Sequence, residues 1–234
     1  GGNLIYQLYV RGDDTWVIDQ LNRATDLGYS AFCITVDSAH YGRRERDKLS
    51  GYTPPARRTP KGARYQAQLN WELIKKIKSK TKLPIILKGI ATVEDALISI
   101  DHEIDIIYIS NHGGRQLDFG LGTTEVLTEI INTTKDHCEI YVDGGFYRGA
   151  DILKAICLGA TAIGLGRLYG YGMAADGVDG IIRVLEILEE EIINAMANLG
   201  VTTLSELNKD LICKSEPVVE PTAFSAFLPV KISH

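Results

Sequence analysis

The sequence contains few cysteines, and their spacing does not match a metal cluster. The four cysteines of the 234 residues are Cys33, Cys138, Cys157 and Cys213, and no two of them form a CxxC pair. Three of the four lie in apolar runs, which is typical of buried free thiols. We therefore expect neither a zinc site nor a disulfide framework.

Excess positive charge and long hydrophobic runs are also missing. The 25 Lys and Arg residues are outnumbered by 30 Asp and Glu residues, for a formal net charge of −5, which argues against a nucleic acid or an anionic membrane as partner. No apolar stretch approaches the roughly 20 residues that a membrane span needs. The N-terminal "GGNLIYQLYV" lacks the features of a signal peptide. We expect a cytoplasmic protein without a transmembrane segment.

Short apolar runs alternate with amphipathic segments along most of the chain. Nearly continuous apolar runs are typical of parallel strands covered on both faces, and amphipathic segments of helices. The pattern predicts strands in residues 4–10, 31–37, 84–90, 104–110, 139–145 and 162–167, and helices in residues 14–29, 69–81, 92–102, 124–134, 149–160 and 177–200. The chain therefore consists of six strand–helix units.

Polar residues end each of the six expected strands, as on the active face of a TIM (β/α)8-type barrel. Six units are two short of eight, so either two units are absent from this chain or the architecture differs; a doubly wound sheet is the alternative. Residues 1–234 are expected to form one domain. Residues 38–67 are expected to form a lid-like or partly disordered loop, and residues 214–234 a C-terminal tail.

The segment "SNHGGRQLD" places His112 and Arg115 three positions apart after a strand. Arginine binds a carboxylate through two parallel hydrogen bonds, and histidine is suited to removing a proton near neutral pH. The pair therefore suits a substrate that carries a carboxylate and an abstractable proton. The alternative is a turn-capping histidine beside a surface arginine.

Two further charged residues end neighbouring strands. Asp37 in "ITVD" could orient an imidazole and stabilise its protonated form, or it could cap the next segment. Lys88 in "PIILKGI" follows four apolar residues and needs an anionic partner, such as a cofactor edge or a substrate, unless it reaches solvent at the strand end.

Glycine-rich turns precede the last two helices. "VDGGFYRG" and "GLGR" would expose backbone N–H groups that can hold a phosphate, with charge added by Arg148 or Arg167. Gln7 and Tyr9 alternate along the first strand and so share a face, where they could contact a ligand or simply fill the barrel.

Seven motifs in order, "QLYV", "ITVD", "GRRERD", "LPIILKGI", "SNHGGRQLD", "VDGG" and "GLGR", resemble the FMN-dependent α-hydroxy acid oxidases and dehydrogenases, which include glycolate oxidase, lactate oxidase and mandelate dehydrogenase. The resemblance covers nearly the whole chain. It implies that this chain corresponds to the C-terminal two thirds of that family, with strands 3 to 8 of an FMN-binding barrel.

The resemblance also implies roles in oxidising an L-2-hydroxy acid to a 2-oxo acid. His112 would abstract the substrate proton, and Asp37 would stabilise the resulting imidazolium. Arg115 would bind the substrate carboxylate together with Tyr9 and Arg44.

FMN would be the cofactor, and no metal is implied. Lys88 would take part in catalysis by stabilising negative charge at the N1–C2 edge of the flavin. The other flavin-contacting residues implied are Gln7, Thr35, Ser110, Asp143, Gly144, Gly145, Phe146, Tyr147, Arg148, Gly166 and Arg167. The electron acceptor would be oxygen, a quinone or a cytochrome, and homo-oligomers are common among such proteins.

The sequence departs from the family in ways that affect the site. The N-terminal third, which carries a further substrate-binding tyrosine, is not in this sequence. Tyr147 stands where many members have arginine, so phosphate binding is expected to be rearranged. Leu168 replaces a common proline. A non-catalytic remnant, one subunit of a split FMN barrel, or another FMN barrel chemistry such as that of inosine-monophosphate dehydrogenase are the alternatives.

Overall fold

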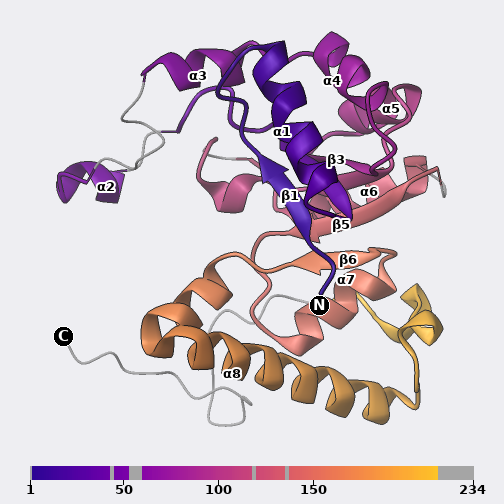
Figure 1. Ribbon diagram of the computed structural model, residues 1–234. Helices are drawn as coiled ribbons and strands as arrows, with labels where there is room; N and C mark the ends of the chain where they lie inside the picture. Colours follow the sequence, from indigo (N-terminus) through magenta and orange to yellow (C-terminus); the bar gives the residue numbers. More distant parts are fainter. Residues whose placement is uncertain (1, 43–44, 53–59, 118–119, 135–136, 216–234) are drawn as a thin grey trace.

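The computed structural model describes residues 2–42, 45–52, 60–117, 120–134 and 137–215. Six parallel strands form one sheet in the order in which they occur in the chain. The sheet curls into an open half-barrel (Figure 1). The strands are β1 (Ile5–Leu8), β2 (Ala31–Thr35), β3 (Ile85–Ile90), β4 (Ile106–Ile109), β5 (Glu139–Asp143) and β6 (Ala162–Gly164). The predicted barrel class is confirmed, and sequential parallel order excludes the doubly wound alternative, in which the strand order reverses.

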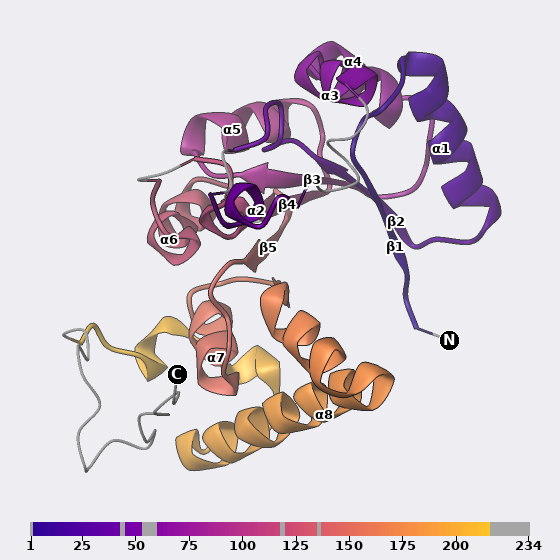
Figure 2. The ribbon, with the colours of Figure 1, turned by 90° about the vertical axis from the view of Figure 1, so that its left-hand side faces the viewer.

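Helices connect the strands and cover the outer face of the sheet. Figure 2 shows α7 packed beside α8 at the bottom of the view, apart from α1, α4 and α5 in its upper part. The helices are α1 (Asp14–Asp26), α2 (Glu45–Leu49), α3 (Pro60–Ala67), α4 (Trp71–Lys78), α5 (Val93–Asp101), α6 (Thr123–Thr134), α7 (Gly149–Cys157) and α8 (Arg167–Leu199), with short 3₁₀ turns η2 (His112–Gly114), η3 (Leu204–Glu206) and η4 (Lys209–Leu211).

The alternation of side chains along each strand separates two apolar layers. Phe32 and Ile34 of β2 point outward and pack with α1, α4, α5 and α6 in the main core. Ala31 and Cys33 point to the inner, concave face, where they meet Ile86 in a smaller cluster. The inner face therefore carries few apolar side chains, which leaves room for polar groups near the carboxyl ends of the strands.

The stretch from residue 38 to residue 67 contains two helices, α2 and α3, in its described part. The sequence pattern predicted none there, because the segment is polar and rich in proline and glycine. Gln66 of α3 is buried, and its amide bridges the N–H of Val10 and the carbonyl of Thr35 at 2.6 and 2.7 Å. This amide ties α3 to the ends of β1 and β2. Residues 43–44 and 53–59 of the expected lid, and residues 216–234 of the expected tail, lie outside the described residues.

The last helix begins ten residues earlier than the sequence predicted. It starts at Arg167 and is interrupted by non-helical angles at Asp176 and Gly177, after which the predicted segment runs on to Leu199. Within the described residues, no helix combines the length and the apolar character that crossing a membrane requires.

The four cysteines are free, in agreement with the sequence analysis. Cys33 and Cys157 are buried, whereas Cys138 is half-buried and Cys213 exposed. Burial raises the pKa of Cys33 to about 12, so this thiol stays protonated at neutral pH. No cluster of three metal-ligating side chains occurs among the described residues.

Candidate functional site

His112, which was expected to abstract a proton, and Asp37, its expected partner, lie next to each other at the carboxyl ends of β4 and β2. Asp37 follows β2 by two residues, and His112 opens η2 with a φ of +55°. Nδ1 of His112 lies 3.0 Å from Oδ1 of Asp37, and the two side chains are 17% and 12% exposed. An ionised carboxylate only accepts hydrogen bonds, so Nδ1 carries the proton and the lone pair of Nε2 is left for a ligand.

Gly89 makes room for Asp37. Its φ is +117°, and a Cβ atom built there would lie 2.5 Å from the Cβ of Asp37. The N–H of Val36 also donates to the carbonyl of Lys88 at 2.8 Å. The close approach of β2 and β3 at this point therefore requires glycine and fixes the carboxylate next to the loop that carries His112.

Lys88 is the centre of a polar network on the inner face. Its Nζ lies 2.9 Å from Oδ2 of Asp143 and donates to Oγ of Ser110, also at 2.9 Å. The Ser110 hydroxyl in turn accepts the backbone N–H of His112 at 3.1 Å. Lys88 is thus ion-paired inside the half-barrel rather than reaching solvent, and Ser110 connects it to the His112 loop.

Tyr108 belongs to the same network, and the sequence analysis did not identify it. The Nζ of Lys88 lies 4.9 Å from the centre of its ring. Burial and, next, the charge of Asp143 raise the pKa of the Tyr108 hydroxyl, so the phenol stays protonated. Its position two residues before Ser110 on β4 places it on the inner face, which is the signal that could have revealed it.

Gln7 and Tyr9 reach the same end of the sheet from β1 and the residues after it. Nε2 of Gln7 donates to Oγ1 of Thr35 at 3.1 Å. The ring of Tyr9 lies edge-on to the His112 ring, with centroids 6.3 Å apart. The structure therefore gathers Tyr9, Asp37 and His112 in one place.

Of the two arginines expected to bind a carboxylate, Arg115 and Arg44, only Arg115 is among the described residues. Arg115 is the C-cap of η2, and it is exposed. Its guanidinium is therefore accessible to a ligand in solvent. Arg44 lies outside the described residues.

The two glycine-rich turns differ in whether carboxylates of the protein already accept the backbone N–H groups at the start of the following helix. At the start of α7, Asp151 accepts the N–H of Arg148 at 3.1 Å and Glu191 accepts the N–H of Gly149 at 2.7 Å. The guanidinium of Arg148 forms an ion pair with Glu191. Carboxylates of the protein thus already fill this helix N-terminus, and a phosphate there would face two negative charges.

Among the described residues, no carboxylate caps the start of α8. Its N-cap is Gly166, without a side-chain hydrogen bond, and Arg167 is the first helical residue. A Cβ atom built on Gly113 would lie 3.4 Å from the Arg167 guanidinium, so Arg167 lies beside the His112 loop. Phe146, by contrast, is 6% exposed and packs in the main core.

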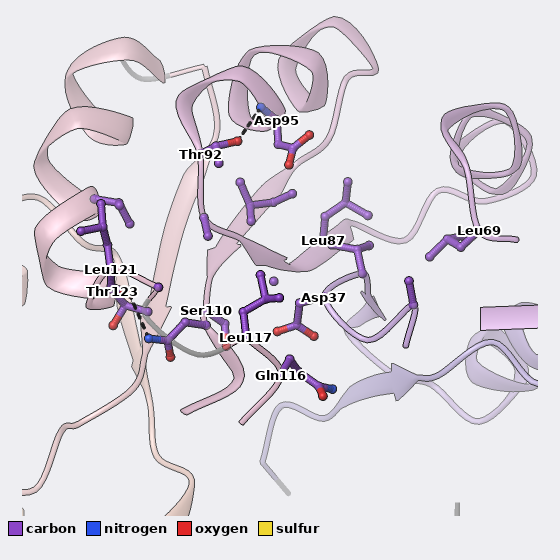
Figure 3. Close-up of a pocket in the computed structure, with 18 of the residues that line it drawn as sticks. Asp37, Leu69, Leu87, Thr92, Asp95, Ser110, Gln116, Leu117, Leu121 and Thr123 are labelled. Carbon is purple, nitrogen blue, oxygen red and sulfur yellow. Dashed lines mark hydrogen bonds between the residues drawn. The ribbon is translucent and has the colours of Figure 1, made fainter. Parts of the chain in front are cut away.

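A cavity of about 740 Å³ adjoins this network. Asp37, Ser110 and Gln116 form part of its wall, with apolar side chains such as Leu87 and Leu117 around them (Figure 3). His112, Lys88 and Asp143 are not among its described lining residues, so the cavity lies beside the ion-pair network rather than within it.

The fold and site define a parallel β/α barrel protein whose titratable groups converge at the carboxyl ends of the strands. Comparison with known proteins identifies the family within this class. The chain belongs to the FMN-dependent dehydrogenase family, whose model matches residues 1–214. The family implies FMN as cofactor.

Several members of this family are similar to the chain in sequence. It is 38% identical to the L-lactate dehydrogenase (cytochrome) of Saccharomyces cerevisiae over 88% of this chain and 39% of that protein. It is 39% identical to the 4-hydroxymandelate oxidase of Amycolatopsis orientalis over 86% of this chain and 62% of that protein. The chain thus spans about two fifths to three fifths of the length of these relatives.

Solved structures agree with the sequence comparison. A structure of mandelate oxidase with (S)-2-phenylpropionate superposes with a TM-score of 0.82 at 40% identity, over 89% of this chain and 62% of that chain. The predicted resemblance to 2-hydroxy acid oxidases and dehydrogenases is confirmed at the level of family, fold and cofactor.

Proposed function

We propose that the protein to which this chain belongs oxidises an L-2-hydroxy acid to the 2-oxo acid with FMN as electron acceptor. The observation that carries the proposal is the 3.0 Å contact between His112 Nδ1 and Asp37 Oδ1 beside the Lys88 network. Relatives named as lactate dehydrogenase, hydroxyacid oxidase and mandelate oxidase support the same substrate class.

His112 acts as the base in this proposal. Removing two electrons and two protons from the hydroxy acid yields the oxo acid, so one protein group must accept a proton. Nε2 of His112 carries the available lone pair, and the positive charge formed on the ring is stabilised by Asp37. Low exposure of both side chains strengthens that stabilisation.

The substrate carboxylate is bound by Arg115 and Tyr9, with Arg44 as a further partner expected from the sequence. Arg115 offers two parallel N–H donors, and it is exposed and thus accessible to a ligand. Tyr9 lies edge-on to His112, which suits a carboxylate a few ångströms from the abstracted proton. Tyr9 therefore lies near the proposed base, and Arg115 follows it by three residues in the chain.

The inner-face network fits a flavin. Lys88 supplies a positive charge for an electron-rich ring edge, while Oδ1 of Asp143 is buried without a hydrogen-bond partner in the described structure. A ribityl hydroxyl is the kind of donor that this oxygen lacks. Ser110, Thr35 and Gln7 would hold the ring and the chain around it. When bound, FMN supplies the two-electron chemistry that these side chains do not have.

The phosphate of FMN is assigned to the start of α8. Gly166 and Arg167 offer an uncapped helix N-terminus and a guanidinium. Gly144, Gly145 and the backbone of residues 146–147 would line the approach to it. Arg148 contributes through its ion pair with Glu191, which joins α7 to α8.

The proposed partners are a small 2-hydroxy acid and oxygen, a quinone or a cytochrome as final acceptor. Relatives include both an oxidase and a cytochrome-linked dehydrogenase, which supports either kind of acceptor. Cytoplasmic location and homo-oligomeric assembly stay predictions from the sequence.

Flavin reduction by the purified chain tests the proposal. The chain is mixed with FMN and freed of unbound flavin, and its absorbance is recorded under anaerobic conditions before and after adding lactate, glycolate or mandelate. Retained flavin that bleaches with one of these acids is the expected result. A folded chain, by circular dichroism, that retains no flavin would instead support a non-catalytic remnant or a split barrel.

A further inference from the structure

The hydroxyl of Ser38 lies at the junction of the His112–Asp37 pair, and no sequence motif indicated a role for it. Ser38 is 1% exposed. Its Oγ lies 3.1 Å from Oδ1 of Asp37, 3.4 Å from Nδ1 of His112 and 2.7 Å from Nε2 of Gln116. One buried hydroxyl thus contacts the base, its carboxylate partner and an amide.

The direction of each hydrogen bond in this cluster can be assigned, starting from the N–H of Gly42. The backbone N–H of Gly42 can only donate, and it meets Oε1 of Gln116 at 2.8 Å. The amide nitrogen of Gln116 therefore faces Ser38 and donates to its oxygen. Because Nδ1 of His112 already carries a proton, the Ser38 O–H donates to Oδ1 of Asp37.

Oδ1 of Asp37 consequently accepts two hydrogen bonds, one from His112 and one from Ser38. Each donor withdraws part of the negative charge of that oxygen. The serine therefore weakens the stabilisation that Asp37 gives to a protonated His112.

We propose that Ser38, held by Gln116, is a positioning residue that limits the basicity of His112. The inference rests on the proposed function, in which His112 must accept a proton and then lose it again. An imidazole bound too strongly to its proton would return to the neutral form slowly, so a moderated partner favours turnover.

The same contacts join the loops that carry the base and its partner. A Cβ atom built on Gly42 would lie 2.3 Å from the carbonyl oxygen of Arg115, so the segment after Ser38 packs directly on the η2 loop. Gln116 connects the two through the N–H of Gly42 and the hydroxyl of Ser38. The segment that follows Asp37 and the η2 loop that carries His112 are therefore held against each other.

The substitution Ser38→Ala replaces none of the charged or titratable groups that surround His112. Asp37 pairs with its ring, Tyr9 lies edge-on to it, and Lys88 is linked to its backbone through Ser110. Arg115 and Arg167 flank its loop. An effect of Ser38→Ala on the titration of His112 thus reports on the hydroxyl.

The test is an NMR titration of the histidine rings in the wild-type chain and in Ser38→Ala, with His112→Gln to assign the signal. We expect the midpoint of the His112 titration to rise by about half a unit to one unit, a three- to tenfold gain in proton affinity. Gln116→Met should shift it in the same direction by less, and Ser38→Thr should restore the wild-type midpoint because it keeps the hydroxyl.

Ser99→Ala is the matched control, because Ser99 is equally buried and donates to the carbonyl of Asp95 at 2.7 Å in α5. It should leave the His112 midpoint unchanged. An unchanged or lowered His112 midpoint in folded Ser38→Ala overturns the inference. If Ser38→Ala does not fold, an unchanged or lowered His112 midpoint in Gln116→Met overturns it. Because the titration needs no flavin, a chain that fails to reduce FMN but shows the shift contradicts only the proposed function.

Discussion

The ammonium of Lys88 and the carboxylate of Asp143 lie 2.9 Å apart on the inner face of the half-barrel, with side chains 12% and 17% exposed. Their strands, β3 and β5, are separated by β4 in the sheet. The pair spans β4 at the level of Tyr108, so the positive charge of Lys88 is balanced within the protein itself.

Replacing Lys88 by Met should lower the free energy of unfolding by about 3 kcal/mol, because the carboxylate of Asp143 is left in a mostly buried place without its cation. The double variant Lys88→Met/Asp143→Leu should lose less than the sum of the two single variants. Urea unfolding of the wild type, the two single variants and the double variant measures these losses. The exposed pair of Lys76 and Asp14, 2.8 Å apart with side chains about half exposed, is the control and should show coupling below about 1 kcal/mol. Additive losses at the buried pair would contradict the prediction.

His112→Ala should slow flavin reduction by about a thousandfold or more while flavin stays bound, because the proton acceptor is removed and the Lys88 network is intact. Anaerobic stopped-flow absorbance measures the rate. His137→Ala, at an exposed position before the amino end of β5, should leave the rate unchanged. Wild-type rates in His112→Ala would refute its role as base.

Arg115→Lys should raise KM roughly tenfold or more, because an ammonium cannot form the two parallel hydrogen bonds of a guanidinium with a carboxylate. Steady-state kinetics over a range of 2-hydroxy acid concentrations measures it. Arg183→Lys changes an exposed arginine of α8 that is paired with Glu186, and it should not alter KM. An unchanged KM in Arg115→Lys would remove this residue from the substrate site.

Arg167→Ala should weaken FMN binding about tenfold to a hundredfold, because a charge-assisted contact with the phosphate is lost. Riboflavin, which has no phosphate, should bind the wild type and this variant equally. Arg148→Ala should keep the preference for FMN over riboflavin, since Arg148 is paired with Glu191. Flavin fluorescence titration measures the six affinities, those of the wild type and the two variants for FMN and for riboflavin. The reverse pattern would move the phosphate to the start of α7.

Stability should fall in acid through Glu191. Burial opposes ionisation, but the hydrogen bonds from Arg148 and from the N–H of Gly149 outweigh it and hold the pKa of Glu191 below its ordinary value of 4.5. A carboxyl whose pKa is lower in the folded state stabilises fully above about pH 4.5, and this contribution is lost as the pH falls through the folded-state pKa. Glu191→Gln should therefore flatten the pH dependence of the melting temperature between pH 5 and about pH 3.

Glu186→Gln is the control, because this glutamate pairs with Arg183 at an exposed position. It should leave the acid limb of the stability curve as in the wild type. A wild-type curve in Glu191→Gln would show that the junction of α7 and α8 is held by apolar packing alone.

Local patterns predicted the elements of the fold well where burial dictates composition. The run "AFCITVD" reads as a strand, and the structure has β2 at Ala31–Thr35 with all five residues buried. A helix was expected in residues 92–102, and in the structure the hydroxyl of Thr92 caps α5 by accepting the N–H of Asp95 at 3.2 Å. The helices α2 and α3 were missed because they are short and polar and lie in a segment rich in proline and glycine.

The sequence also predicted candidate residues for the site, but it could not describe their contacts. Asp37 and His112 are 75 positions apart, and a strand-end rule places them on one face without giving a distance. One of the two carboxylates at the start of α7 comes from Glu191, 42 positions after Gly149. Spacing along the chain contains no such information.

By itself, the sequence determined the parallel β/α architecture and the residue types at the strand ends, because hydrophobic periodicity and the polarity of strand termini are local properties. Only the tertiary structure decided which donor serves which acceptor. It placed Ser38 between Asp37 and Gln116, assigned Arg148 to Glu191, and left the start of α8 open. Hydrogen bonds act over about 3 Å, and residues far apart in the chain come that close only when the strands have curled into a barrel.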